Sequence, residues 1–208
     1  RGFNSLATFN YNGDESPISG GLDLFYQNMA RSNWIIKQML AKEKKGGLSD
    51  VEHRSLGEAF FMRGMAHFWI AYRYGTKAQG VPFVRYEYFE GDYDNSIPPQ
   101  QASVIDNYKF IIEDMDNAIS YLPKFEEYSD DDKGRAHKAA AVAYKAKVYA
   151  YWATWDETQW NNVIAMVNSL ETDYGRGLAD TFAEVFSSEF TDFWNKEYIW
   201  SIPSNGGS

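Results

Sequence analysis

The sequence contains no cysteine, few basic residues and no long hydrophobic run, and each of these features excludes a class of protein. Without cysteine, the 208 residues cannot form disulfides, thiolate metal sites or a cysteine nucleophile. The 20 lysines and arginines are outnumbered by 29 acidic residues, and the net charge of −9 argues against nucleic-acid binding. Charge or glycine interrupts every apolar stretch before the roughly 18 residues that a membrane helix needs.

The chain does contain enough apolar and aromatic surface for a folded core. Hydrophobic residues make up 44% of the sequence, and Trp, Tyr and Phe together make up 17%. This composition excludes general disorder, and we expect a single domain over residues 1–208. We also expect both ends to be cut from a longer protein, because the chain starts at Arg1 without an initiator Met and ends just after a strand-like run.

Apolar residues at steps of three and four predict a series of helices over residues 22–170. The first helix is expected over roughly 22–44. The second is expected over roughly 50–74, opened by a capping box in which Ser49 is followed by Glu52. Three further helices are expected over 104–122, over about 135–154 and after Asp156.

Small residues line one side of the second expected helix. Gly57 and Gly64 would each cost about 1 kcal/mol of helix propensity. We therefore expect a neighbouring helix to pack closely against this side.

The fold class that follows is all-α in the main, with helical hairpins stacked like tetratricopeptide repeats of about 34 residues. Residues 1–20 are expected to form a loop, and a second long aromatic loop is expected between Gly80 and Pro99. Residues 171–208 are expected to add a short helix and a minor strand near the carboxy end, where 197–202 alternate in polarity.

Three segments of the sequence agree in order and spacing with one known family. They are residues 56–64 with 72–75 and 81–84, residues 97–99 with 112–119 and 122–123, and residues 134–141 with 145–149. Together they resemble the amino-terminal helical half of the SusD/RagB family of outer-membrane nutrient-binding lipoproteins. The resemblance extends over roughly residues 22–202.

The resemblance implies a non-catalytic protein that is lipid-anchored at the outer membrane and exposed on the cell surface. Such a protein captures oligosaccharides, polysaccharides or other nutrients and passes them to a SusC-like TonB-dependent outer-membrane transporter. Neither a cofactor, a metal nor a nucleic acid is expected as a partner. Contact with the membrane would run only through an anchor cysteine located before Arg1.

Glycan binding requires flat aromatic rings flanked by amide and carboxylate groups. Two loops offer such residues, and the resemblance favours the first, which precedes the first helix. The candidate ligand-binding residues are Tyr11, Asn12 and Asp14 in the first loop and Tyr86, Tyr88 and Tyr93 in the second. The alternatives are a loose terminus for the first loop and, for each ring of the second, packing on the helical core.

Other aromatic residues and the histidines are expected to be structural. Four tryptophans lie within expected helices and are assigned to the core: Trp34, Trp69, Trp152 and Trp160. His53, His67 and His137 have no partner at metal-ligand spacing, so each is expected to be structural or exposed.

Two other functions stay open at this stage. An all-helical glycosidase needs only two carboxylates about 5 to 10 Å apart, and the chain has 29 acidic residues. A structural repeat adaptor would instead use its tyrosine-rich loops to bind protein partners.

Overall fold

The computed structural model describes residues 8, 16–86, 100–186 and 194–201, and these residues form helices and connecting segments without a β-strand. The long helices are α2 (Ser16–Gly46), α3 (Asp50–Tyr74), α4 (Val104–Tyr121), α5 (Lys138–Ala153) and α6 (Trp160–Thr172). The short ones are η3 (Phe125–Glu127), η4 (Asp130–Asp132), η5 (Glu157–Gln159) and α7 (Phe182–Val185). The expected all-α class is confirmed.

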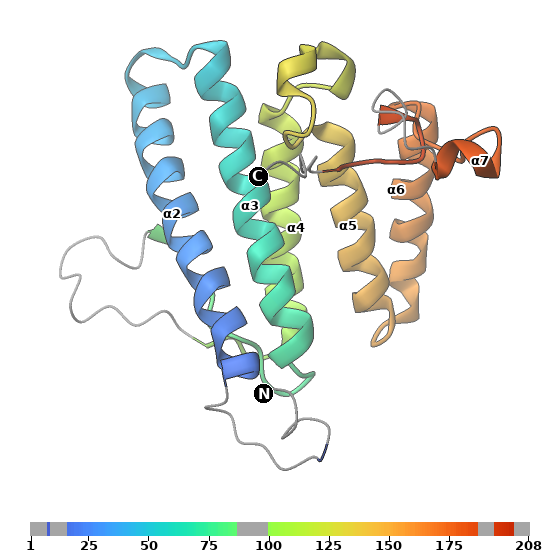
Figure 1. The fold of residues 1–208 in the computed structure, drawn as a ribbon. Coiled ribbons are helices and arrows are strands. Elements are labelled where there is room, and N and C mark those ends of the chain that lie inside the picture. The colour runs from blue at the N-terminus through green and yellow to red at the C-terminus, as the bar shows by residue number, and fades with distance from the viewer. Residues whose placement is uncertain (1–7, 9–15, 87–99, 187–193, 202–208) are drawn as a thin grey trace.

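The long helices stand side by side in chain order from α2 to α6 and alternate in direction (Figure 1). Each packs against the next, and α3 also contacts α5. Because α3 and α5 are separated by one helix, they run parallel. This is the stack of helical hairpins that the sequence predicts.

The close packing expected at the small residues of α3 is present, and the neighbour is α4. A Cβ placed on Gly57 would lie 2.8 Å from Leu122 Cγ, and one placed on Gly64 would lie 2.6 Å from Met115 Cε. These distances are too short for a side chain, so the two glycines let α3 and α4 approach. The predicted packing side of α3 is thereby confirmed.

Local capping signals set several helix ends. The predicted capping box opens α3: the Ser49 N–H donates to Glu52 Oε2 over 3.0 Å. At the start of α4 the Ser103 hydroxyl accepts from the Asp106 N–H, and at the start of α5 His137 accepts from the Ala140 N–H.

Two boundaries differ from the sequence-based expectation. Helix α2 begins at Ser16, inside the segment 1–20 that was expected to be a loop, because Pro17 in the first turn favours a helix start. The minor strand expected over 197–202 is absent from residues 197–201, and residue 202 lies outside the described part. No described residue forms a strand with which the backbone of this segment could pair.

A connecting segment over residues 80–86 packs between α2 and α4, on a different side of α3 from α5. Val81 and Phe83 are buried there. The Asn107 side chain donates to the Val81 carbonyl and accepts from the Val81 N–H, each over 2.9 Å. Asn33 Nδ2 donates to the Val84 carbonyl over 2.6 Å. Buried amide side chains therefore fix this segment to the helices.

Candidate functional site

Aromatic rings form a continuous seam between the parallel helices α3 and α5. The ring centres of Phe61 and Tyr144 are 5.3 Å apart, and those of Phe68 and Tyr151 are 5.2 Å apart, each in an edge-to-face arrangement. Both pairs recur after seven residues, which is about two helical turns, so the rings of each helix stay on one side.

One end of the seam is covered by the carboxy-terminal segment. The Trp200 ring lies 5.0 Å from Phe61 and 6.3 Å from Tyr144, and its indole N–H donates to the Gly134 carbonyl over 3.0 Å. Figure 1 shows this segment crossing in front of α5 toward α3. Trp200 therefore covers the seam at Phe61 and Tyr144.

At the other end of the seam the rings face solvent. Tyr151 is 37% exposed, and Trp69 and Tyr72 are half-buried. The Tyr72 ring lies 5.0 Å from Tyr151 and 5.6 Å from Trp69. Together with two cations, Arg73 and Lys147, these rings make a group that we call the open seam: Trp69, Tyr72, Arg73, Lys147 and Tyr151.

The two cations of the open seam lie over its rings. The Arg73 guanidinium is 4.4 Å from the centre of the Trp69 ring and 5.3 Å from that of Tyr72. Lys147 Nζ is 5.5 Å from the Trp69 ring centre. All three distances suit cation–π attraction. Helix α2 adds Phe25, whose ring is parallel to Trp69 at 6.1 Å.

The chemistry of the open seam is that of a binding surface. Its aromatic faces can stack on the apolar face of a sugar ring, and its guanidinium, ammonium and phenol groups can hydrogen-bond to sugar oxygens. None of its five residues is a carboxylate. Trp155 follows Tyr151 by four residues, just past the end of α5, and is 41% exposed.

Of the candidate residues from the sequence, only Tyr86 lies in the described part. Its side chain is half-buried against the helical core and lines a small pocket of about 170 Å³ with Arg63 and Glu113. This pocket lies between α2 and α4, so the structure does not bring Tyr86 to the open seam. Tyr11, Asn12, Asp14, Tyr88 and Tyr93 lie outside the described residues.

The structure corrects the assignment of several tryptophans to the core. Trp34 is 66% exposed and Trp160 is 48% exposed, because each points outward from a helix at the side of the stack. Trp69 is half-buried in the open seam, whereas Trp152 packs against the core as expected. The sequence could have predicted that Trp69, Tyr72 and Arg73 cluster, because their spacing of three and four residues places them on one side of a helix.

A buried polar network joins α2, α3 and α4. Arg63 donates from Nε and an Nη to the two oxygens of Asp114, over 3.0 and 2.6 Å, and from its other Nη to Asn33 Oδ1 over 2.7 Å. Burial raises the pKa of Asp114, and the Arg63 guanidinium opposes this shift. Because both carboxylate oxygens are bonded to Arg63, the network serves the fold.

Two histidines are buried and structural, as the sequence predicts. His67 stacks on Phe83 at 4.3 Å, and its Nε2 accepts from Asn107 Nδ2 over 2.7 Å. Burial lowers the pKa of His67 to about 3. Burial also lowers the pKa of His137, the residue that caps α5, to about 4.

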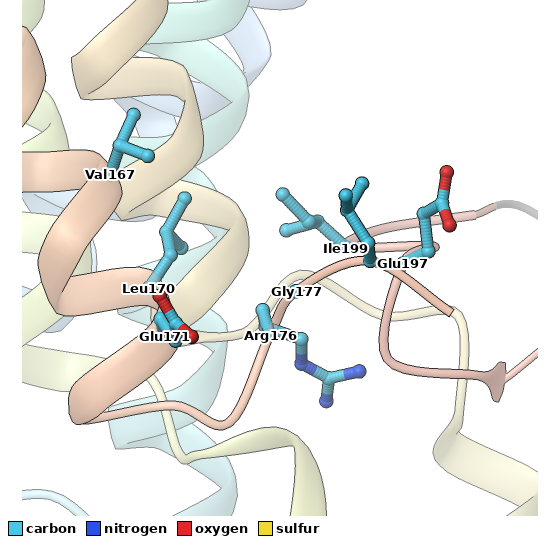
Figure 2. Close-up of a pocket in the computed structure, with 8 residues that line it drawn as sticks. Val167, Leu170, Glu171, Arg176, Gly177, Glu197 and Ile199 are labelled. Carbon is cyan, nitrogen blue, oxygen red and sulfur yellow. The ribbon is translucent and has the colours of Figure 1, made fainter. Parts of the chain in front are cut away.

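A second concave surface lies between α6 and the carboxy-terminal segment (Figure 2). It encloses about 560 Å³, and its apolar walls are aliphatic: Val167, Leu170, Leu178 and Ile199. The Arg176 side chain points away from α6 and lies over Phe125 at 4.3 Å. Among the described residues that line this cavity none carries an aromatic ring, so they offer no stacking surface for a sugar.

The part of the chain that the structure describes includes no helix with both the length and the apolar character required to cross a bilayer. No curated protein matches the sequence significantly.

The fold is that of several solved structures. A SusD-like protein from Bacteroides fragilis has a TM-score of 0.72 at 23% identity, over 96% of this chain and 36% of that protein. A SusD superfamily protein from Bacteroides vulgatus has a TM-score of 0.70 at 24% identity, over 94% and 38%. A third, solved with xylogluco-oligosaccharide, has a TM-score of 0.69 at 23% identity, over 94% and 37%.

The present chain therefore spans little more than a third of the length of these proteins, 36% in the first case. A family model for SusD-like proteins, described as starch-binding and associating with the outer membrane, matches residues 3–150. With this match over most of its helices, the chain belongs to the SusD-like family, as its three sequence segments predict.

Proposed function

We propose that the protein binds glycans at the cell surface without modifying them and passes them to a SusC-like TonB-dependent transporter. A lipid anchor would hold it at the outer membrane. Membership of a family described as starch-binding and outer-membrane-associated supports this proposal, as does the fold shared with a protein solved with xylogluco-oligosaccharide. The main structural support for glycan binding is the open seam.

The geometry of the open seam suits a short stretch of sugar chain. The rings of Tyr72 and Tyr151 meet at 58° with their centres 5.0 Å apart, so they present two adjoining faces at an angle. Trp155 lies two residues beyond the end of α5 and adds a further exposed ring. Several rings in a row can contact successive sugar units, which favours an oligosaccharide over a single monosaccharide.

Binding without catalysis is supported by the placement of the carboxylates. Burial raises the pKa of Asp114, as a general acid of a glycosidase would require, but both its oxygens are bonded to Arg63. The open seam itself contains no carboxylate. Incubation with polysaccharides should release no new reducing ends, and a steady release would show that the protein is a glycosidase.

The proposal keeps the candidate residues of the two loops. Tyr11, Asn12, Asp14, Tyr88 and Tyr93 would extend the ligand surface beyond the open seam, and Tyr86 would do so from the α2–α4 side. If the protein passes glycans to a TonB-dependent barrel, we expect the anchored protein to copurify with that barrel from solubilised outer membranes. Its purification without such a barrel would contradict the hand-off.

Loss of a ring from the open seam should weaken glycan binding. For Tyr72→Ala and Tyr151→Ala we expect the binding free energy to fall by about 1 to 3 kcal/mol, as for removal of a stacking side chain at a binding surface. Isothermal titration calorimetry with the tightest-binding oligosaccharide from a panel of neutral and acidic glycans measures this loss.

The matched control for this test is Trp34→Ala, which removes a ring that is 66% exposed on α2 and lies apart from the open seam. We expect this variant to bind like the parent protein. If Tyr72→Ala and Tyr151→Ala also bound like the parent, the ligand surface would lie elsewhere on the molecule.

A further inference from the structure

The protein carries a strong excess of negative charge, so any local excess of positive charge is informative. Its net charge is −9. Many of its described lysines and arginines are neutralised by carboxylates, for example Arg135 by Glu58 at 2.7 Å and Lys145 by Asp116 at 2.5 Å. Such pairs cancel the field of the cation at short range.

Arg73 and Lys147 differ from these cations. Among the described residues neither forms an ion pair with a carboxylate, and both are exposed. They lie instead over aromatic rings: Arg73 over Trp69 and Tyr72, and Lys147 over rings that include Trp69. A ring orients a cation but leaves its charge uncompensated.

The two cations converge on one point although they come from different helices. Arg73 is in the last turn of α3 and Lys147 is in the middle of α5. Both lie within 6 Å of the Trp69 ring centre, at 4.4 and 5.5 Å. Asp156, an acid at the end of α5, is engaged in capping, since its carboxylate accepts from the Thr158 N–H and from Gln159.

We propose that the open seam selects glycans that carry carboxylate or sulfate groups, with Arg73 and Lys147 receiving the anionic group while Tyr72 and Tyr151 stack on the sugar rings. This inference rests on the proposed function and adds the ligand class to it. It distinguishes this chain from its relative solved with xylogluco-oligosaccharide, a glycan that carries neither anionic group.

The physical basis is the strength of charge-assisted hydrogen bonds. A guanidinium presents paired N–H donors that fit a carboxylate or a sulfate, whereas a hydroxyl receives a weaker neutral bond. The remaining surface, with its excess of acidic groups, repels a polyanion. An acidic glycan is therefore held only where the local charge is positive, and electrostatic attraction guides it there.

The test compares ligands that differ only in charge. Oligosaccharides from polygalacturonate, alginate and chondroitin sulfate are each titrated beside the same oligosaccharide after carboxyl reduction and desulfation. Neutral xylogluco-oligosaccharide completes the panel. We expect at least one acidic oligosaccharide to bind about tenfold more tightly than its neutral form, and this preference to shrink at high salt because exposed charges are screened.

Variants of the two cations assign the preference to the open seam. Arg73→Gln and Lys147→Gln should each weaken binding of the acidic ligand about three- to tenfold more than they weaken binding of its neutral form. The control is Lys44→Gln, which makes the same change in net charge in the last turn of α2, at the opposite end of the stack. It should leave the preference intact, and the melting temperature of each variant is measured to show that it is folded.

The outcomes separate this inference from the proposed function. Equal binding of acidic and neutral forms, or equal loss of both in Arg73→Gln and Lys147→Gln, would overturn charge selection while glycan binding stands. A preference that Lys44→Gln reduces as much as Arg73→Gln does would also overturn it. If no member of the panel binds, the proposed function fails, and this inference fails with it.

Discussion

Arg63 and Asp114 show how much a single pair of residues can contribute to this fold. Both side chains are almost fully buried, and their two hydrogen bonds join α3 to α4. A third bond from Arg63 reaches Asn33 of α2, which in turn holds the carbonyl of Val84. Removal of the guanidinium would leave a carboxylate and an amide oxygen buried without their partner, and this is the costly situation for a buried ion pair.

The first prediction at the residue scale concerns this pair. Arg63→Met should lower the free energy of unfolding by about 3 to 5 kcal/mol, because Asp114 stays buried and loses its partner. Lys109→Met on α4 is the control, since it breaks the exposed pair with Asp106 and should cost less than about 1 kcal/mol. Urea titration followed by circular dichroism measures both changes, and equal losses would contradict a structural role for the buried pair.

At the scale of elements, the approach of α3 to α4 depends on residues without side chains. A Cβ on Gly57 would meet the Leu122 backbone N at 2.9 Å as well as its Cγ at 2.8 Å. A backbone atom cannot move aside as the end of a flexible side chain can. Gly21 in α2 is the opposite case, because nothing lies within 4 Å of the position that its Cβ would take.

These two glycines predict changes of opposite sign. Gly57→Ala should destabilise the protein by about 1 to 3 kcal/mol, since overpacking outweighs the gain in helix propensity. Gly21→Ala should stabilise it by about 0.5 to 1 kcal/mol, because only the propensity changes. Midpoints of urea unfolding report both effects. Stabilisation by Gly57→Ala would mean that α3 and α4 do not approach each other closely at Leu122.

The elements were predictable from the sequence where their ends depend on local signals. The expected bounds of α3 agree with the observed Asp50–Tyr74 because the Ser49–Glu52 box and Gly75 act within one turn. The sequence predicts too late a start for α2 because Gly20 and Gly21 have low helix propensity, although a helix tolerates glycine at a modest cost. Exposure of Trp34 and Trp160 was missed because a helical stripe does not reveal whether another element covers it.

At the scale of the whole molecule, the open seam could not be predicted because it depends on which helices adjoin. Phe61 and Tyr144 lie in different hairpins, and only the parallel packing of α3 and α5 pairs their rings. The same holds for Trp200, which closes one end of the seam from the far end of the chain. The residue types were visible in the sequence, but the side of the stack on which they meet was not.

The buried histidines link the stability of the whole fold to pH. The pKa of His67 falls to about 3, first through burial and then through the charges of Arg63 and Arg85. The pKa of His137 falls to about 4 through burial and the charge of Arg176, while a backbone hydrogen bond and Glu126 act in the opposite direction. In the unfolded chain both groups titrate near 6.5, so between about pH 6.5 and 4 the unfolded state binds protons that the folded state excludes.

Above pH 6.5 the two neutral histidines therefore make their full contribution to the free energy of unfolding. As the pH falls toward 4, the free energy of unfolding decreases by about 1.4 kcal/mol per pH unit for each histidine. His137→Asn tests this at one site, because asparagine also accepts the N-cap hydrogen bond of α5 but does not titrate in this range. Its free energy of unfolding, measured by urea titration from pH 7 to 4.5, should fall less steeply than that of the parent by about 1.4 kcal/mol per pH unit. Parallel curves for the two proteins would show that His137 is protonated as readily in the folded state as in the unfolded chain.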